Sequence, residues 1–229
     1  MFIKEWGLNM ANPPQDNLEI YLSPTSFIDS DSPGVIKFAE QCTYNAKSRI
    51  DKSIKIFYAV RDQIKYDPYH IELSPDKFNA SRVLTQQTGW CVEKALLLAA
   101  AGRALGIPSR LGFADIRNHL VPESLKKTMK TDLFIFHGYT EMFLNDRWIK
   151  ATPAFNLALC EKFDIVPVEF NGEKDAGFHQ FDRKGNKHIE YIADHGSFAD
   201  LPLERIVAVY RIYYPQFFDG TETAGELKS

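Results

Sequence analysis

Apolar residues recur at helical spacing in the first half of the chain. Ser48 and Asp51 resemble a capping box, and the apolar residues between 50 and 61 have a roughly helical period. An earlier helical pattern begins with Ser32 in the N-cap position and Pro33 in the first helical position. These patterns predict two helices near the start of the chain.

The stretch TGWCVEKALLLAAAGRALGIPSR predicts a third helix, which is richer in alanine and leucine. It runs from about 91 to 105, Gly106 stands where a left-handed C-cap residue is expected, and Pro108 prevents the helix from continuing. Cys91 occupies the first turn of this helix, shortly after a glycine. A thiol at that position is the first candidate for chemistry in the chain.

The second half of the chain favours strands. Residues 109–116 predict a strand, and residues 133–155 predict a β-hairpin that turns at Asn145-Asp146. β-Branched and aromatic residues at about 206–213 predict another strand, and NLEIYL near the N-terminus predicts a short one. Helices followed by strands indicate an α+β fold and not a wound α/β sheet.

The length of 229 residues is enough for one large domain or two small ones, each with a buried core. We expect a single domain over residues 1–215, with its motifs within about 50–156 and its C-terminal strands within about 186–215. Residues 216–229, which contain Gly, Thr, Glu and Lys, predict a flexible tail.

Composition excludes several classes of function. The formal net charge of -3 lacks the clustered basic character of a nucleic-acid-binding protein. The longest apolar run, near 95–101, is too short to span a bilayer, and the N-terminus has no secretory h-region. Three cysteines are too few for a disulfide scaffold, and their spacing forms no zinc pattern. We therefore expect a cytoplasmic protein that binds no membrane and no nucleic acid.

The position of Cys91 suits a nucleophile. A helix N-terminus carries partial positive charge and unpaired N–H groups, so a thiolate there is stabilised and its pKa is expected to fall. The alternative is that Cys91 is a small buried hydrophobic residue, as most free cysteines are, and Cys42 and Cys160 are interpreted in that way.

A thiol nucleophile needs a base within hydrogen-bonding reach, and the chain has six histidines. His137 begins the most strand-like segment and is followed by Gly138, so a rigid strand would position its ring. His119 and His195 lie in loop-like sequence. We interpret the five histidines other than His137 as surface or capping residues.

The hairpin gives His137 a predicted neighbour. A two-residue turn at Asn145-Asp146 pairs Phe143 with Trp148 and Glu141 with Lys150, an aromatic pair and an opposite-charge pair. The same register pairs Tyr139 with Thr152, which places Thr152 diagonally opposite His137 on one face of the sheet. Thr152 is therefore predicted to orient the imidazole.

Two motifs resemble those of the transglutaminase-like superfamily. GWCVEKALLLAAAGRALGIPSR at 89–110 is similar to its cysteine motif, and HGYTEMFLNDRWIKATPAF at 137–155 is similar to its histidine motif. The segments YDPY at 66–69 and ASRVLTQQTG at 80–89 resemble those that precede the cysteine in bacterial members. The resemblance covers roughly residues 50–156.

The resemblance implies a papain-like core, in which the cysteine begins a central helix packed on an antiparallel sheet. It implies that Cys91 attacks an amide carbonyl of a peptide or protein, that His137 is the general base and acid, and that the acyl group passes to an amine or to water. Neither a metal nor an organic cofactor is implied.

The chain departs from the family pattern at the third position. The family carries aspartate before Pro-Thr, whereas this chain has Thr152 before Pro153. A threonine hydroxyl can accept a bond from the imidazole but supplies no negative charge. Asn156 is a second candidate for orienting the ring, by analogy with papain-like proteases.

The oxyanion donors are predicted near the cysteine. The backbone N–H of Cys91 is the first candidate, and the side chains of Gln86 and Gln87 are further candidates, although polar loop residues are common before a helix. Two functions are therefore carried forward: a cysteine hydrolase or acyltransferase, and a catalytically silent binding module that retains the fold. Thr152 favours the silent module, whereas the presence of both Cys91 and His137 favours the enzyme.

Overall fold

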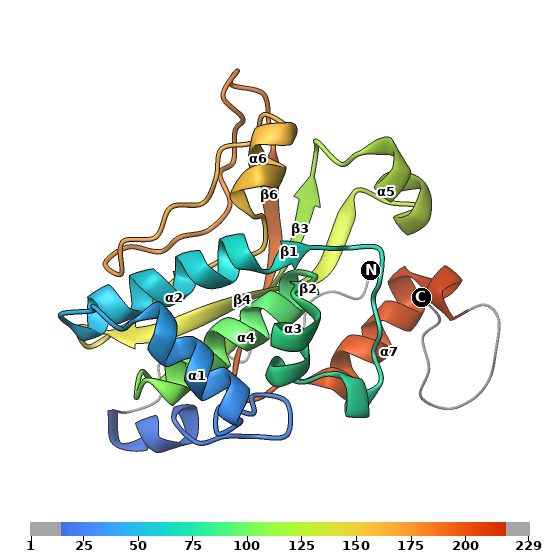
Figure 1. Cartoon of the computed structure of the whole chain (residues 1–229). Helices are drawn as coiled ribbons and strands as arrows, with labels where there is room; N and C mark the ends of the chain where they lie inside the picture. Colours follow the sequence, from blue (N-terminus) through green and yellow to red (C-terminus); the bar gives the residue numbers. More distant parts are fainter. Residues whose placement is uncertain (1–14, 219–229) are drawn as a thin grey trace.

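Helices dominate the first half of the molecule, as predicted. The structure is a computed structural model that describes residues 15–218 (Figure 1). In chain order its first elements are η1 (Gln15–Tyr21), α1 (Pro33–Cys42), α2 (Arg49–Gln63), β1 (Lys65–Tyr66), η2 (Pro75–Lys77), α3 (Ala80–Gln86), β2 (Thr88–Gly89) and α4 (Cys91–Ala104).

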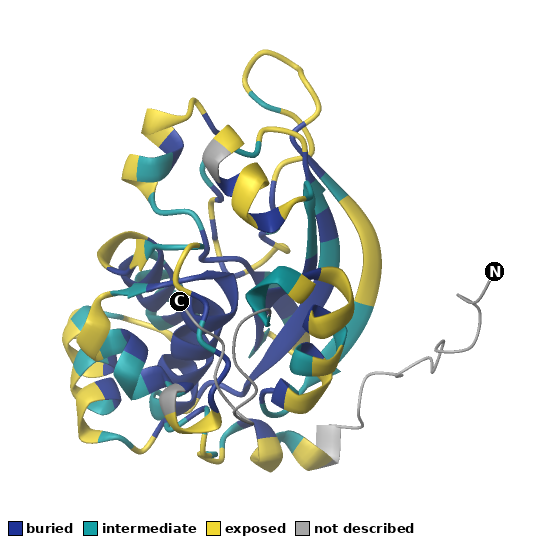
Figure 2. Ribbon diagram, turned by 90° about the vertical axis from the view of Figure 1, so that its right-hand side faces the viewer, coloured by how far each residue is buried: buried dark blue, intermediate teal, exposed yellow. Residues whose placement is uncertain are grey.

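Helix α4 is the centre of the fold. Every residue from Cys91 to Arg103 is buried, which is why this helix is apolar over most of its circumference (Figure 2). Helices α1, α2 and α3 pack against it, and the central strands of the sheet pack against it as well. Lys94, which is fully buried, donates from Nζ to the carbonyl oxygens of Arg61 and Ile64 at 2.8 and 2.6 Å and so caps the C-terminal end of α2.

The second half of the described chain builds the sheet. Its elements are β3 (Ser109–Asn118), α5 (Glu123–Met129), β4 (Leu133–Leu144), β5 (Arg147–Ala151), α6 (Leu157–Lys162), β6 (Ile189–Phe198), α7 (Leu203–Tyr213) and η3 (Pro215–Phe217). Four antiparallel strands form a sheet with the order β5-β4-β3-β6, and β1 and β2 form a short parallel pair. This arrangement confirms the predicted α+β fold, with a central helix on an antiparallel sheet.

The predicted hairpin is confirmed in its register. Leu144 pairs with Arg147, Phe143 with Trp148 and Glu141 with Lys150. Asn145 and Asp146 both have positive φ, at 47° and 59°, which is the geometry of a type I′ turn. The two-residue turn at Asn145-Asp146 therefore sets which residues face each other across β4 and β5, as predicted from the sequence.

The helix signals are also confirmed, with one difference. Ser48 Oγ accepts from the Asp51 N–H at 3.1 Å, as a capping box requires. The Asp51 carboxylate, however, accepts from the Lys47 N–H at 2.8 Å and not from Ser48. Gly106 has the left-handed conformation expected after α4, with φ of 72°.

Two strand predictions are wrong. Residues 206–213 belong to helix α7, whose buried residues Leu203, Ile206 and Tyr210 follow a spacing of three and four residues. Their β-branched neighbours favoured a strand, but the apolar spacing is helical and decides the structure. The predicted N-terminal strand is instead the 3₁₀ helix η1, where Tyr21 packs edge-on against Trp148 at 4.9 Å.

The remaining boundaries stay predictions. Gln216 and Phe217, the start of the predicted tail, belong to η3, and Phe218 follows it. Residues 219–229 lie outside the described residues, as does the segment before residue 15. Within the described part of the chain, no helix has the length and apolar character needed to cross a bilayer.

Candidate active site

The turn before α4 places Cys91 at the first position of the helix. The carboxylate of Glu93 folds back and accepts from the Trp90 N–H at 3.1 Å. A side chain at position 89 would be crowded, because a Cβ on Gly89 would lie 3.0 Å from the Cβ of Glu93, which would have to shift slightly. Gly89 and Glu93 together therefore fix the entry of the chain into α4.

Strand β4 passes unusually close to the start of α4. A Cβ on Gly138 would lie 2.9 Å from the Cα of Val92, a distance that forces one of the two backbones to move. Two residues further along β4, Thr140 Oγ1 donates to the carbonyl oxygen of Ala95 at 2.7 Å. These contacts press β4 against the first turns of α4 and bring its neighbouring residue, His137, to the N-terminal end of that helix.

A bulge in β4 directly precedes His137. His137 pairs with Ala114 and Phe134 pairs with Ile116, so two residues of β4 face a single residue of β3, which is one extra residue on β4. Phe136, inside the bulge, has φ of 54°, which is an uncommon conformation for an aromatic residue. The bulge changes the direction in which the strand presents its side chains.

Asp115 and His195 hold this bulge in place. Asp115 Oδ1 accepts from the Phe136 N–H at 2.9 Å and lies 2.6 Å from His195 Nε2. The His195 ring stacks on the Phe136 ring, with centroids 4.1 Å apart. This arrangement could not be predicted from the sequence, because it joins β3, β4 and β6 through contacts between residues far apart in the chain.

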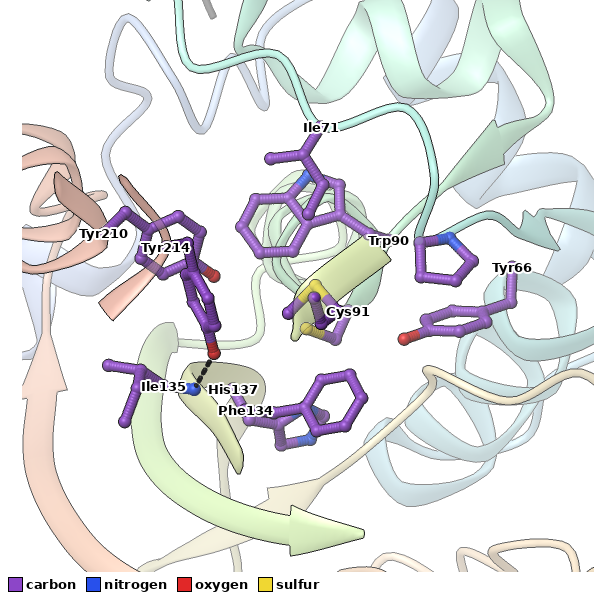
Figure 3. Close-up of a pocket in the computed structure, with 11 residues that line it drawn as sticks. Tyr66, Ile71, Trp90, Cys91, Phe134, Ile135, His137, Tyr210 and Tyr214 are labelled. Atoms are coloured by element: carbon purple, nitrogen blue, oxygen red, sulfur yellow. Dashed lines mark hydrogen bonds between the residues drawn. The ribbon is translucent and has the colours of Figure 1, made fainter. Parts of the chain in front are cut away.

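Tyr214 holds the bulge from the other side. Its hydroxyl donates to the Leu133 carbonyl oxygen at 2.8 Å and accepts from the Ile135 N–H at 2.7 Å. The second of these bonds is drawn in Figure 3. The segment after α7 is thereby attached to the strand that carries His137.

Cys91 and His137 line the same cavity (Figure 3). The cavity has a volume of about 20 Å³, room for roughly one water molecule. Most of its wall is apolar or aromatic, from Tyr66, Trp90, Phe134, Tyr210 and Tyr214 among others. Cys91 is 6% exposed and His137 is 4% exposed, so the pair lies in a closed site.

Burial controls the protonation of this pair. It raises the pKa of Cys91 to about 12, although backbone N–H groups of Gly138, Val92 and Cys91 lie near the sulfur and favour the thiolate. It lowers the pKa of His137 to about 3. The sequence-based expectation of a lowered thiol pKa is therefore wrong for this closed site, which holds a neutral thiol and a neutral imidazole near pH 7.

His137 has an unsatisfied ring nitrogen. Its Nε2 atom is buried and has no hydrogen-bond partner. The ring packs against Phe178 with centroids 4.9 Å apart, at a tilt of 36°. An unpaired polar atom inside a protein is costly, so a buried one beside a candidate nucleophile marks a place where a ligand or reacting group can bind.

The structure does not join Thr152 to His137. Thr152 is 2% exposed and lines a different cavity, of about 420 Å³, together with Tyr139 and Lys150. No hydrogen bond links Thr152 with His137 in residues 15–218. Asp115 is paired with His195, and Asp194 bonds to Gly196 and Lys150, so neither supplies the missing carboxylate.

The other predicted polar residues also lie outside the cavity. Asn156 Oδ1 accepts from the Tyr66 N–H at 3.2 Å and makes no bond to His137. Gln86 and Gln87 are both exposed. Gln87 Nε2 donates to the Leu84 carbonyl oxygen at 2.6 Å, and the Gln86 amide faces the Arg82 guanidinium.

The donors near the cysteine sulfur are backbone groups. The N–H of Cys91 was predicted, whereas those of Val92 and Gly138 were not. A spacing argument could have suggested Val92, since the first N–H groups of a helix have no partner within it. Across residues 15–218, no group of three or more His, Cys, Asp or Glu side chains is arranged to hold a metal ion.

Comparisons with known proteins agree with the two sequence motifs. The model of the transglutaminase-like superfamily matches residues 36–153, just over half of the chain. No curated protein matches. A solved structure from Cytophaga hutchinsonii, named as a candidate cysteine protease, is 18% identical to this chain, with a TM-score of 0.48. The alignment covers 79% of this chain and 53% of the Cytophaga chain, so this chain spans about half of the length of that protein. Because the family match includes Cys91, His137 and Thr152, and extends over most of the helical half and the hairpin, this chain belongs to the transglutaminase-like superfamily.

Proposed function

We propose that this protein attacks amide carbonyls of a peptide or protein through Cys91, with His137 as general base and then general acid. Membership of the superfamily supports a thiol-dependent, enzyme-like function. The observation that carries the more specific proposal is the cavity shared by Cys91 and His137, in which a buried nitrogen of His137 has no partner.

The neutral resting pair favours a particular order of steps. When an amide carbonyl reaches the sulfur, His137 takes the thiol proton as the sulfur attacks the carbonyl carbon. The negative charge that develops on the carbonyl oxygen needs nearby donors, for which the N–H groups of Cys91, Val92 and Gly138 are the candidates. His137 then gives its proton to the leaving amine, and a thioester on Cys91 remains.

The second half of the reaction restores the enzyme. Water or an amine, deprotonated by His137, attacks the thioester carbonyl and expels the Cys91 thiolate, which recovers its proton from His137. Water as acceptor gives a carboxylic acid, and an amine as acceptor gives a new amide. Both products follow from the same two residues, so hydrolase and acyltransferase are distinguished by the acceptor and not by the nucleophile.

The test is turnover and covalent trapping with amide substrates. We expect Cys91→Ala and His137→Asn to lower the turnover of peptide amides by at least about a thousandfold, with Cys42→Ala as the matched control that leaves it unchanged. Intact-mass measurement should find an acyl adduct on Cys91 of the wild type. Turnover that survives in Cys91→Ala, or an adduct on Cys42, would contradict the assignment.

Two further measurements refine the proposal. Since no hydrogen bond joins Thr152 to His137, Thr152→Ala should change kcat by no more than about tenfold. This limit is slightly larger than the change in kcat expected from the loss of one neutral hydrogen bond, which contributes about 1 kcal/mol. Adding a primary amine should yield amide product if the protein is an acyltransferase and only acid if it is a hydrolase.

A catalytically silent binding module is the second candidate. The observation that favours it is the closed cavity, in which burial keeps both Cys91 and His137 uncharged, without a carboxylate bonded to the ring. This candidate predicts that peptides bind to the wild type and to Cys91→Ala with equal affinity and that neither protein turns them over.

A further inference from the structure

A second hollow opens beside the cysteine cavity. We call it the His137 cleft. It has a volume of about 290 Å³ and shares Tyr66, Pro68, Phe134 and His137 with the cavity that holds Cys91. The histidine therefore stands in the wall between the two, and a molecule in the cleft lies next to the reacting groups.

The wall of the His137 cleft is mostly apolar. It is formed by side chains from five separate parts of the chain, among them Ile116, Leu125, Phe155, Leu159, Ile165 and Phe178. The Phe155 and Phe178 rings stack with centroids 4.6 Å apart, and Phe178 also packs on the His137 ring. Although the wall also includes the polar side chains of Asn118 and Lys162, its mostly apolar surface favours a large apolar group over the side-chain amide of glutamine.

The rim of the cleft exposes apolar surface. Tyr69 is 45% exposed, Leu120 is 36% exposed and Phe163 is 41% exposed, and all three line the cleft. Several large apolar side chains exposed around one hollow are typical of a ligand-binding site. The volume lies near the lower end of small-molecule sites, which span roughly 300–1,000 Å³, so it fits one side chain and not a long peptide.

One cation stands at the cleft. Lys162, at the end of α6, lines it and is exposed. In the described part of the chain, no carboxylate lies within 4.0 Å of the Lys162 ammonium group. Lys162 is the one Lys or Arg in the cleft wall, and no Asp or Glu belongs to that wall. The Lys162 ammonium group lies 5.4 Å from the centroid of the Phe163 ring. The charge at the mouth is thus positive and is not neutralised by a carboxylate.

We infer that the His137 cleft binds one large apolar side chain of a peptide substrate, of the size of phenylalanine, leucine or methionine, with an acidic group of the same peptide beside Lys162. The inference rests on the proposed function for its reacting atoms, but binding to the cleft does not require turnover. The apolar side chain would place the neighbouring amide bond next to His137 and Cys91.

The test measures binding in the full-length Cys91→Ala protein, which cannot form an acyl adduct at that position. Each fluorescently labelled hexapeptide has one variable residue, which is Phe, Leu, Ala, Gln or Lys. In one set of peptides the residue before the variable position is Asp or Asn, and in a second set the residue after it is Asp or Asn. We expect the Phe and Leu peptides to bind at least about tenfold more tightly than the Ala, Gln and Lys peptides. We expect Asp on one side to improve binding severalfold over Asn.

Matched variants locate the site. Leu159→Trp should fill the cleft and remove the preference for Phe, whereas Leu157→Trp, on the same helix but outside the cleft wall, should leave it unchanged. Lys162→Gln should abolish the advantage of Asp, whereas Lys174→Gln, also exposed, should not. Equal binding of the Phe, Ala and Gln peptides would overturn the inference. A fatty acid that displaces the labelled peptide more strongly than every unlabelled peptide does would overturn it as well.

The outcome separates this inference from the proposed function. If Phe peptides bind selectively but the wild type never forms a Cys91 adduct, the proposed chemistry fails and the cleft assignment stands. If the wild type acylates Cys91 equally well from peptides with any residue in the variable position, the chemistry stands and the cleft assignment fails.

Discussion

Two opposing effects act on the ionisation of the Cys91 thiol. Backbone N–H groups at the start of α4 favour the thiolate, an effect that is about 0.3–1 kcal/mol and reaches about 2 kcal/mol when partly buried. Burial raises the thiol pKa from 9.0 to about 12, which corresponds to about 4 kcal/mol against ionisation. Desolvation therefore outweighs the helix terminus, and a sequence shows the helix terminus but not the depth of burial.

His137 should make the stability of the protein depend on pH. Burial lowers its pKa from 6.5 to about 3, so below pH 6.5 the unfolded chain binds a proton that the folded chain does not. The stabilising contribution is complete above pH 6.5 and is lost as the pH falls from about 6.5 toward 3. We expect wild-type stability to fall more steeply than that of His137→Asn between pH 7 and pH 4.5.

Urea unfolding at a series of pH values measures this difference. His179→Asn, which changes an exposed histidine, is the control and should follow the wild type. If wild type and His137→Asn lose stability in parallel, His137 is not buried in its neutral form.

Among the elements, α7 and η3 decide how firmly the β4 bulge is held. Tyr214 bonds to Leu133 and Ile135 at the start of β4, and Tyr210 lines the cavity with Cys91. Without the Tyr214 hydroxyl, the Ile135 N–H would lose its partner, a cost of about 1–3 kcal/mol for a buried group. The helix at the C-terminal end therefore serves as a cover of the candidate site as well as a part of the fold.

Tyr214→Phe should open the site. We expect this change to raise the rate at which iodoacetamide alkylates Cys91 severalfold, because the cover is held less firmly, while the rate at Cys160 stays unchanged. Tyr213→Phe, in which the changed side chain is 49% exposed, is the control and should alter neither rate. Mass spectrometry of each cysteine gives both rates, and an equal rise at Cys91 and Cys160 would indicate general loosening instead.

The same elements show what a sequence can predict. Caps at Ser48 and Gly106 and the turn at Asn145-Asp146 are local, so they were read correctly. The bulge before His137 was not, because it depends on Asp115 and His195, which reach it from other strands. Helix α7 differs from the predicted strand because the helical spacing of the buried residues Leu203, Ile206 and Tyr210 outweighs the strand preference of its β-branched residues.

At the scale of the whole molecule, the site exists because one face of α4 is pressed against the sheet while its other sides are covered by α1, α2 and α3 (Figures 1 and 2). The Cys91 and His137 motifs, nearly fifty residues apart, meet only when β4 docks on α4. The sequence predicted both motifs and the packing of a helix on a sheet. It did not predict that the cavity would be closed or that Thr152 would face a different one.

Gly138→Ala tests this docking. A methyl group there would lie 2.9 Å from the Val92 backbone, so we expect a loss of about 1–3 kcal/mol in unfolding free energy. Turnover should fall by a larger factor than stability alone explains, because β4 moves away from Cys91. The control is Gly34→Ala, where a Cβ meets no atom closer than 3.9 Å and turnover should stay unchanged. If Gly138→Ala turns over substrate as fast as the wild type, the close approach of β4 to α4 has no role in the reaction.

The contact between Gly138 and Val92 also bears on how such a protein can change in evolution. One added carbon atom at position 138 would clash with the Val92 backbone, and we expect it to move His137, the candidate base, away from Cys91 while both motifs stay intact in the sequence. An enzyme of this architecture could thus become a binding protein through a single substitution that no inspection of its cysteine and histidine would reveal. Conversely, a descendant silenced by this one substitution would regain the close approach when glycine returns to position 138.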